Sequence, residues 1–300
     1  MILLNKLMYK KRSISVFILP SLLIYTLIIV IPIFVSAYLG LFKWSGIGAM
    51  QFIGLQNYKK LLFSDEIFRH SITNSLILAG ASVFIQLPIA FILALILSSG
   101  VRFEKFFRTV YFIPVILSSM VIAQLWLRIF DSNYGLVNAL LRAVGLGQYA
   151  QPWLANTNTA FTCTVIPAIW QYIGQYILIM YSGLKAIPDE IHEAAKIDGA
   201  NKWQMTTRIT IPLLSPVIKV CIIFAMTGSF KSFDLVFAMT NGGPFHSSEL
   251  PSTVMYTNLF SAGAYGYGSA QAVFIVIECL IATLIIQLLF KKSEAEVSAV

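Results

Sequence analysis

Long apolar runs separated by short polar segments fill this sequence from end to end. A transmembrane helix needs about 20 apolar residues to cross a hydrocarbon core of about 30 Å. Six runs reach that length and predict an all-α integral membrane fold with six transmembrane helices, in one domain that covers residues 1–300. The expected spans are residues 13–42, 71–98, 109–130, 159–184, 211–240 and 268–290.

A basic segment precedes the first run, as it does in a secretory signal peptide. Its residues are Lys6, Lys10, Lys11 and Arg12. The apolar core of a signal peptide has about 7–15 residues, and this run is about twice as long. We therefore expect a retained first helix, kinked at Pro20 and Pro32.

Lys and Arg residues gather on alternate connecting segments. The N-terminal tail, the second loop, the fourth loop and the C-terminus hold 13 of the 21 basic residues. Cytoplasmic loops carry an excess of Lys and Arg, so this bias predicts that both termini lie inside the cell. It places residues 187–208 in the cytoplasm and the polar, Gly-rich segment 131–158 outside.

The composition agrees with a membrane protein: 58% of the residues are hydrophobic and 11% are charged, against about 25% charged in a soluble domain. The net charge of +8 does not indicate a nucleic-acid partner, because the basic residues form no stripe with interleaved aromatic residues. Cys163, Cys221 and Cys279 each lie inside an apolar run, which predicts buried structural thiols. The three histidines are dispersed, so we expect no metal site.

One polar stretch, residues 187–201, interrupts the apolar pattern in the second half of the chain. Pro188 presets the backbone for a helix start, and the acidic side chains of Asp189 and Glu190 suit the positive end of the helix dipole. Gly199 can adopt the left-handed conformation that closes a helix, and Asn201 can cap a second helix. The pattern predicts a short helix, a turn and another short helix on the membrane surface, suited to docking in a groove of another protein.

The same stretch carries a resemblance to a known family. Glu193-Ala194-Ala195-x-x-Asp198-Gly199-Ala200, followed by Ile209-Thr210-Ile211-Pro212-Leu213-Leu214, resembles the EAA loop of ABC importer permeases, in particular those of the maltose and glycerol-phosphate uptake systems. The resemblance implies a type I importer permease fold with a cytoplasmic coupling helix. By this resemblance, Glu193, Ala194, Ala195, Asp198 and Gly199 couple the chain to an ATPase subunit, and an ordinary amphipathic surface helix is the alternative.

Three further segments are similar to the same family. They are Phe52–Tyr58, the turn Thr240-Asn241-Gly242-Gly243-Pro244 and the helix start Tyr265–Ala270. Together with the EAA loop, they spread the resemblance over nearly the whole chain. Residues 245–253 depart from it, because this segment is longer and less regular than the resemblance leads us to expect.

The resemblance also implies a set of partners in a bacterial cytoplasmic membrane. These are two ATPase subunits, a second permease of different sequence that makes a heterodimer, an extracytoplasmic binding protein and a sugar-like solute. The chain has no G-x-x-x-x-G-K-[ST] motif and no plausible catalytic constellation, so we expect no enzyme activity and no cofactor; ATP and Mg²⁺ would bind to the partner ATPase. The alternatives are an ion-coupled secondary transporter, which would show inverted halves and several intramembrane acids, and a membrane-embedded enzyme.

Aromatic, amide and hydroxyl side chains within the spans are candidates for a solute pathway, because such groups are costly against lipid. The candidates are Gln124, Trp170, Tyr172, Gln175, Ser229, Ser232 and Phe233. The resemblance places Ser229 and Ser232 among sugar-contacting positions. The alternative for each residue is that it joins neighbouring helices by hydrogen bonds.

Two charge pairs are also expected. Lys231 and Asp234 are three residues apart and would pair on one face of the fifth span. Glu278 and Lys219 have similar depths in the sixth and fifth spans, which favours an interhelical ion pair. The alternatives for the second pair are a protonated Glu278 and a Lys219 that reaches the inner interface.

Overall fold

The computed structural model describes residues 11–297, and side chains from residue 17 to residue 291. The basic residues Lys6 and Lys10 of the N-terminal tail lie outside the described residues. The α-helices are α2 (Lys11–Tyr25), α3 (Ile31–Leu39), α4 (Gln56–Lys59), α5 (Glu66–Ala81), α6 (Leu87–Ser98), α7 (Glu104–Ile116), α8 (Ser119–Ile129), α9 (Leu136–Ala143), α10 (Ala160–Lys185), α11 (Asp189–Ile197), α12 (Lys202–Gln204), α13 (Ile211–Phe230), α14 (Asp234–Thr240), α15 (Pro251–Tyr256) and α16 (Tyr265–Val297). The other elements are the π-helical turns η1 (Thr26–Val30), η2 (Lys60–Ser64), η3 (Ser82–Gln86), η5 (Met205–Thr210) and η6 (Thr257–Ser261), the 3-10 turn η4 (Gly147–Tyr149), and the strands β1 (Phe42–Lys43) and β2 (Gln51–Phe52).

The chain forms two compact units. Unit 1 contains the described residues up to Ser64 together with Met255–Phe274, and unit 2 contains Asp65–Val254 together with the described residues from Ile275 onward. Each unit therefore combines segments that are far apart in the sequence.

In unit 1, the first apolar helix, Phe17–Leu39, leads into a short antiparallel pair of strands in which Phe42 faces Phe52. The buried side chain of Asn57 donates hydrogen bonds to the carbonyl oxygens of Gly40 and Phe42, each at 2.9 Å. The amide nitrogen of Gly266 donates to the carbonyl oxygen of Trp44 at 3.3 Å. A side chain at residue 266 would collide with the Phe42 carbonyl, so this close approach requires glycine.

Three of the π-helical turns have a common cause. η1, η3 and η5 end two residues before Pro32, Pro88 and Pro212, respectively. A proline ring inside a helix clashes with the carbonyl group four residues earlier and removes one hydrogen bond. The wider π-turn accommodates the displaced carbonyl while the helix continues through the proline.

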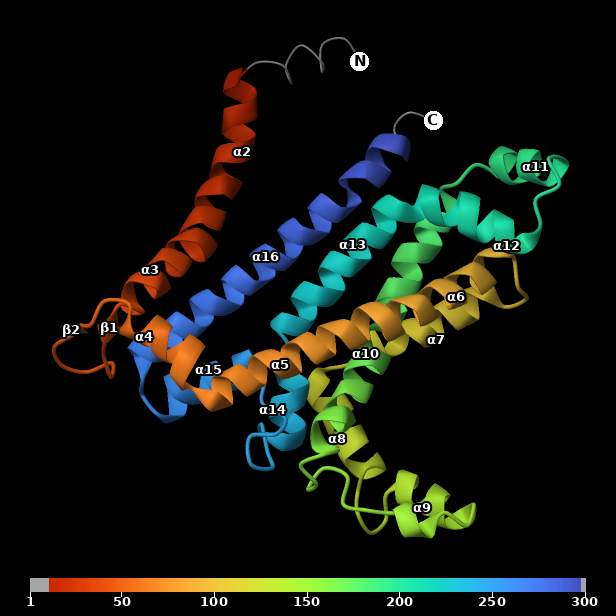
Figure 1. Cartoon of the computed structure of the whole chain (residues 1–300). Helices are drawn as coiled ribbons and strands as arrows, with labels where there is room; N and C mark the ends of the chain where they lie inside the picture. The colour runs from red at the N-terminus through yellow and green to blue at the C-terminus, as the bar shows by residue number, and fades with distance from the viewer. Residues whose placement is uncertain (1–10, 298–300) are drawn as a thin grey trace. The chain divides into compact units, whose positions relative to one another are not determined.

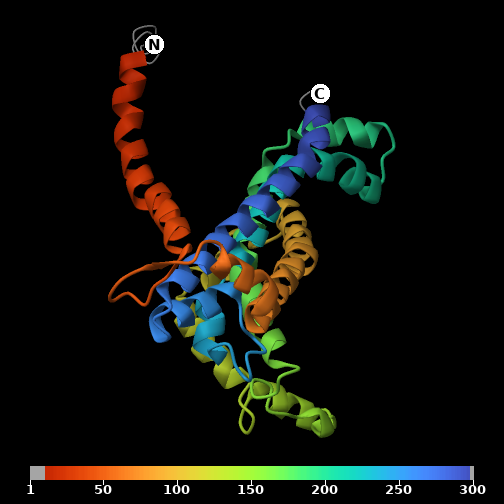
Figure 2. The ribbon, with the colours of Figure 1, turned by 60° about the vertical axis from the view of Figure 1, so that its left-hand side comes forward.

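In unit 2, α10 lies at the centre and packs against α6, α7 and α13. The largest apolar core is formed by buried residues of α6, α10 and α13, including Ala94, Met180 and Leu214. Gly174 of α10 lies directly against the Tyr111 carbonyl of α7, where no side chain would fit. The hairpin of α11 and α12 lies at the end of unit 2 opposite α9 in both views (Figure 1, Figure 2).

The predicted third span, residues 109–130, is not one helix. α7 and α8 meet at an angle of 97°. Leu117 is extended, and the Ser118 hydroxyl caps α8 by accepting a hydrogen bond from the amide of Met120 at 3.3 Å. The buried Gln171 side chain of α10 donates to the Leu117 carbonyl at 3.3 Å, so the corner is held by a residue far away in the sequence.

Among the described residues, five helices are long and apolar enough to cross a membrane, and six if α7 and α8 are counted as one broken span. Outside the third span, these helices are Phe17–Leu39, Glu66–Ser98, Ala160–Lys185, Lys202–Thr240 and Tyr265–Lys291. The fold is thus the predicted all-α membrane fold, with a bent third span.

Candidate functional site

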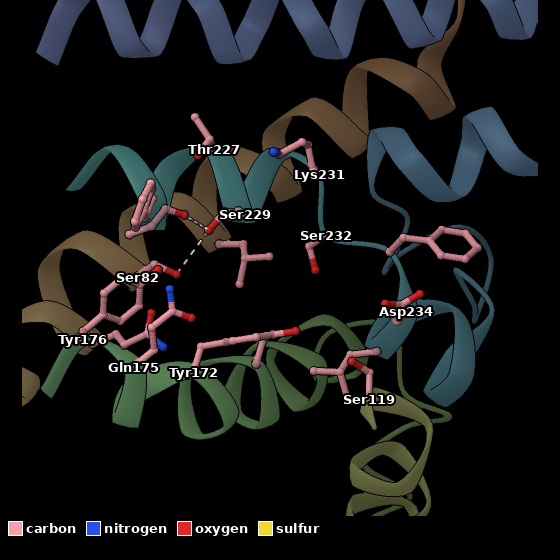
Figure 3. A pocket seen from close by; sticks show the side chains of 18 residues that line it. Ser82, Ser119, Tyr172, Gln175, Tyr176, Thr227, Ser229, Lys231, Ser232 and Asp234 are labelled. Carbon is pink, nitrogen blue, oxygen red and sulfur yellow. Dashed lines mark hydrogen bonds between the residues drawn. The ribbon is translucent and has the colours of Figure 1, made fainter. Parts of the chain in front are cut away.

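Unit 2 contains a cavity of about 410 Å³ among α5, η3, α8, α10, α13 and α14 (Figure 3). Its polar lining consists of hydroxyl, amide and charged side chains, with aromatic rings beside them. The lining residues that matter for the argument are Ser82, Gln86, Ser119, Tyr172, Gln175, Tyr176, Thr227, Ser229, Lys231, Ser232, Phe233 and Asp234.

One wall of the cavity belongs to α10. Tyr172, Gln175 and Tyr176 are three and four residues apart, so they project from one face of this helix. Figure 3 shows them opposite Ser229 and Ser232. The amide nitrogen of the Gln86 side chain donates to the Ile169 carbonyl at 2.7 Å, which fixes the amide group beside this wall.

The opposite wall belongs to the end of α13. Ser229 is buried, and its hydroxyl donates to the Ala225 carbonyl at 2.8 Å and lies 3.2 Å from the Ser82 hydroxyl. The Ser82–Ser229 contact joins η3 to α13 in the lining of the cavity. Ser229 therefore combines two roles that the sequence left as alternatives, since it lines the cavity and joins two helices.

The helix breaks after Phe230, and α14 begins at Asp234. Lys231 and Asp234 both line the cavity with exposed side chains, but they do not share a helix face. No ion pair joins them among the described residues. The expected Lys231–Asp234 pair is therefore wrong. The three-residue spacing predicts a pair only on a continuous helix, and the helix is interrupted at residues 231–233. The two side chains therefore line the cavity separately.

The structure brings five of the seven pathway candidates together at the cavity: Tyr172, Gln175, Ser229, Ser232 and Phe233. Trp170 is not part of the lining, and its ring packs edge-to-face on Trp126, with 5.9 Å between the ring centroids. Gln124 lines a second hollow of about 370 Å³, between the end of α8 and residues 152–155.

Asp131 lines this second hollow as well. Its carboxylate accepts hydrogen bonds from the backbone amides of Tyr134, at 2.8 Å, and Asn133, at 2.9 Å. These two bonds lower the pKa of Asp131, because they favour the ionised form. Asp131 thus fixes the turn that leads from α8 into the segment 131–158.

Sequence reasoning missed several cavity residues, and Ser82, Gln86 and Ser119 are the clearest cases. Ser82 and Gln86 lie on η3, whose π-turn alters the helical spacing ahead of Pro88. Pro88 is the signal that would have drawn attention to this segment. Ser119 lies at the start of α8, directly after the unexpected corner.

The segment 187–201 forms the predicted first short helix, α11, and the turn after it. The predicted second short helix, ending before Pro212, is wrong, because α12 continues without a break through η5 into α13. α11 begins after Pro188, Gly199 has a φ of 82°, and the Asn201 side chain accepts from the Gln204 amide at 2.9 Å. The Gln204 side chain reciprocally accepts from the Asn201 amide at 2.9 Å, which completes a capping box.

The five proposed coupling residues lie on this hairpin with different exposures. Glu193, Ala194, Asp198 and Gly199 are exposed, and Ala195 is buried. Ala195 therefore packs inside the hairpin, and the other four residues are accessible to a partner.

The Glu278 carboxylate faces α5. One oxygen, Oε1, accepts a hydrogen bond from the Ser75 hydroxyl at 3.4 Å, and Oε2 is buried with no hydrogen-bond partner. The expected Glu278–Lys219 ion pair is therefore wrong. Equal depth in the membrane did not establish that the two side chains share a face, and the neighbouring Cys279 and Ala282 pack with Ala79 of α5 and Phe230 of α13.

Among the described residues, no group of three or more His, Cys, Asp or Glu side chains is arranged to hold a metal ion.

Residues 86–294 match the model of a family described as the inner membrane component of binding-protein-dependent transport systems. The probable ABC transporter permease YurN of Bacillus subtilis is 36% identical over 283 residues, which cover 93% of this chain and 96% of the relative. The probable starch degradation products transport system permease AmyD of Thermoanaerobacterium thermosulfurigenes is 30% identical over 280 residues, covering 93% and 94%. A chain in the crystal structure of a bacterial alginate ABC transporter, in complex with a periplasmic protein that holds an alginate pentasaccharide, is similar with a TM-score of 0.80 and 22% identity, covering 93% and 94%.

Proposed function

The chain belongs to the family of inner membrane components of binding-protein-dependent transport systems, and from this membership we propose that it is the permease subunit of an ATP-driven importer for a sugar, an oligosaccharide or a related polyol. It is a multi-pass membrane protein, and its family is one of transport subunits rather than of enzymes. The solute class is the part of the proposal that goes beyond the family.

The side chains that line the cavity are the main support for a sugar-like solute. Hydroxyl groups of a sugar need donors and acceptors that water would otherwise supply, and Ser232 and Gln175 offer them. The apolar face of a pyranose ring suits an aromatic ring, and Tyr172 and Phe233 provide two. A relative whose name refers to starch degradation products supports the same class.

The exposed surface of the α11–α12 hairpin is the proposed docking site of the ATPase. Glu193 offers a charged hydrogen bond to the partner, Ala194 permits close approach, and Gly199 supplies the turn. ATP and Mg²⁺ would bind to that partner. One hairpin in this chain suits one ATPase subunit, so two ATPases would require a second permease, which we propose has a different sequence.

In the proposed cycle, the cavity is open alternately to the outside and to the cytoplasm. An extracytoplasmic binding protein delivers the solute, and closure of the two ATPases on ATP rocks the permeases through their docking hairpins. The cavity in unit 2 would then face each side in turn. The energy of this shift comes from the ATPases, since the solute alone cannot drive its own accumulation.

Reconstitution tests the proposal. The chain is purified with its associated subunits, placed in proteoliposomes with ATP inside, and supplied with a panel of radiolabelled sugars, polyols and amino acids together with candidate binding proteins. We expect an ATPase in the complex and ATP-dependent uptake of a carbohydrate. Uptake driven by an ion gradient without an ATPase would contradict the importer, and uptake of amino acids alone would contradict the solute class.

A further inference from the structure

The turn between α6 and α7, residues 99–103, presents an aromatic ring and a positive charge at its surface. Phe103 is 66% exposed, and its φ of 66° is in the left-handed region that non-glycine residues rarely adopt. The guanidinium carbon of Arg102 lies 5.2 Å from the centroid of this ring, within the range of a cation–π contact. The backbone of the turn and this contact together fix the ring and the charge side by side.

Side chains near the end of α10 hold the same turn. Nζ of Lys185 donates to the Ser98 carbonyl at 2.9 Å, and the Tyr181 hydroxyl donates to Oε1 of Glu104 at 2.5 Å. Arg108 lies 3.7 Å from the same Oε1 atom, and its guanidinium carbon lies 4.8 Å from the centroid of the Tyr181 ring. The turn is therefore fixed to the part of α10 that leads into the α11–α12 hairpin (Figure 1).

Positive charge gathers around this turn. We define the basic cluster as four residues: Arg102, Lys105, Arg108 and Lys185. Residues 98–108 and 181–185 contain one acidic residue, Glu104, whose carboxylate already binds Tyr181 and Arg108. Arg102 and Lys105 are exposed and form no ion pair among the described residues. The cluster therefore has positive charge that the described part of the chain does not neutralise.

An apolar face of α7 begins beside the basic cluster. Phe106, Val110 and Ile113 are four and three residues apart, so they lie on one face of the helix, and all three are exposed. α7 is the first half of the broken third span, so an exposed apolar face on it suits hydrocarbon. At the basic cluster this face gives way to charge, which is the pattern of a helix end at the edge of a bilayer.

The charge of the cluster favours a lipid over a protein as its partner. Lys185 precedes the first residue of α11 by four residues, so the cluster lies on the same side of the membrane as the α11–α12 hairpin. If that side is the cytoplasm, the facing loops of a second permease would also carry an excess of Lys and Arg and would repel the cluster. Anionic phospholipids of the cytoplasmic leaflet attract basic segments beside a membrane helix.

We propose that Arg102, Lys105 and Lys185 bind the phosphate of an anionic phospholipid headgroup, with Phe103 and Phe106 against its acyl chains. The lipid belongs to the leaflet next to the α11–α12 hairpin, which is the inner leaflet under the function proposed above. Arginine forms paired hydrogen bonds with phosphate oxygens, and lysine supplies a compact charge. Lys185 keeps two N–H donors for the headgroup after its bond to Ser98. Glu104 and Arg108 position the turn.

Photocrosslinking tests the contact directly. The photoreactive amino acid p-benzoylphenylalanine replaces Phe103 in the assembled complex, in proteoliposomes of equal parts phosphatidylglycerol and phosphatidylcholine, and adducts are identified by mass spectrometry. The same replacement of Phe84, which is 79% exposed on η3 within a membrane span, is the matched control. We expect phosphatidylglycerol to exceed phosphatidylcholine at least about tenfold among adducts from position 103, and not among those from position 84. Equal labelling from position 103, or adducts with protein subunits alone, would overturn the proposal.

Substitution tests the contribution of single charges. One Lys or Arg near an anionic membrane surface contributes about a fivefold preference, so Lys105→Gln should lower the lipid ratio at position 103 about fivefold. Arg102→Gln should lower it at least as much. Lys291→Gln is the matched control, because Lys291 is an exposed lysine at the end of the Tyr265–Lys291 span, and it should leave the ratio unchanged. Monodispersity of each complex reports on folding. An unchanged ratio in both Lys105→Gln and Arg102→Gln would overturn the proposal.

The outcomes separate this inference from the proposed function. A complex without an ATPase, in which phosphatidylglycerol is still enriched at position 103, would overturn the proposed function and leave the lipid site in place. An ATP-driven importer that labels the two lipids equally would overturn the lipid site alone.

Discussion

Ser229 shows how one residue can both join two helices and line a cavity. Its hydroxyl donates within α13 and contacts Ser82 on η3, and the residue also lines the cavity. Isolated polar groups in a membrane helix gain from such partners, which explains why a small hydroxyl residue suits this position. Ser229 is 5% exposed, so a larger side chain at this position would have to extend into the cavity that it lines.

Ser229→Trp should therefore block transport. The indole would fill part of the cavity of about 410 Å³, and we expect uptake to fall at least about tenfold while the ATPase still co-purifies. Ser182→Trp is the matched control, because Ser182 is an exposed serine of α10 that also donates to the carbonyl four residues earlier, at 2.9 Å. Unchanged uptake in Ser229→Trp would show that the solute does not pass this position.

Glu278 gives a second residue-level prediction. Its described hydrogen bond is to Ser75, so a neutral amide should replace the carboxyl group with little loss. We expect Glu278→Gln to keep the yield of folded protein and Glu278→Lys to lower it, since a charge near the bilayer centre costs about 2.5–3.5 kcal/mol on insertion scales. Adding Lys219→Glu to Glu278→Lys should not restore the yield. Recovery by this double exchange, measured as monodisperse protein, would reinstate the ion pair.

At the scale of elements, the α11–α12 hairpin is determined by local signals. A side chain built on Gly199 would meet nothing within 4 Å of this chain, so the positive φ and the proposed ATPase partner are what would restrict this position. Substitutions of Gly199 can therefore test the backbone turn and the docking surface separately. A residue that tolerates the left-handed conformation tests the turn, and a bulky residue tests the docking surface.

Gly199→Arg should abolish ATPase binding and uptake while the protein still inserts into the membrane. Gly199→Asn should keep most of the ATPase binding, because asparagine adopts the left-handed conformation at low cost. Co-purification of the ATPase with each variant gives the measurement. Normal binding in Gly199→Arg would contradict the assignment of the hairpin as the docking site.

The corner between α7 and α8 depends on a distant side chain instead. Gln171→Leu would remove the amide donor to the Leu117 carbonyl, and a typical intramolecular hydrogen bond contributes about 0.5–1.5 kcal/mol to stability. We expect a lower thermal midpoint for this variant. Gln175→Leu, one turn further along α10 at the cavity, should change the midpoint little and reduce uptake instead. Equal midpoints for the two variants would show that Gln171 does not hold the corner.

These elements mark what the sequence could and could not predict. Apolar run length identified the membrane helices, and proline, glycine and asparagine identified the α11–α12 hairpin, because both depend on local chemistry. The corner at Leu117 could not be read from residues 109–130, since Gln171 stabilises it from another helix. Tyr172 and Gln175 were found by residue type, whereas Ser82 was missed because its approach to Ser229 depends on the packing of η3 against α13.

At the scale of the whole molecule, unit 1 joins the described residues up to Ser64 to the distant segment Met255–Phe274. Lys60 lies over the ring of Tyr267, with 4.3 Å from Nζ to the ring centroid, and Asn258 donates to the Gln271 side chain at 3.1 Å. The hydrogen bond from Gly266 to Trp44 completes this set. The segment around β1 and α4 therefore takes its partners from residues near the start of α16.

The contact between Trp44 and Gly266 can form only late in synthesis of the chain. Trp44 and Gly266 are about 220 residues apart, and at about 5–20 residues per second the ribosome needs roughly 10–45 s to reach the second after the first. During that interval, the pair of strands β1 and β2 lacks its contact with Gly266, because a contact between residues far apart in sequence can form only after the intervening chain has been made. Nascent chains stalled before residue 255 should be cleaved by protease near Trp44, and chains stalled well beyond residue 274 should resist. Translation of residues 255–274 thus determines when the segment around Trp44 becomes protected from proteolysis.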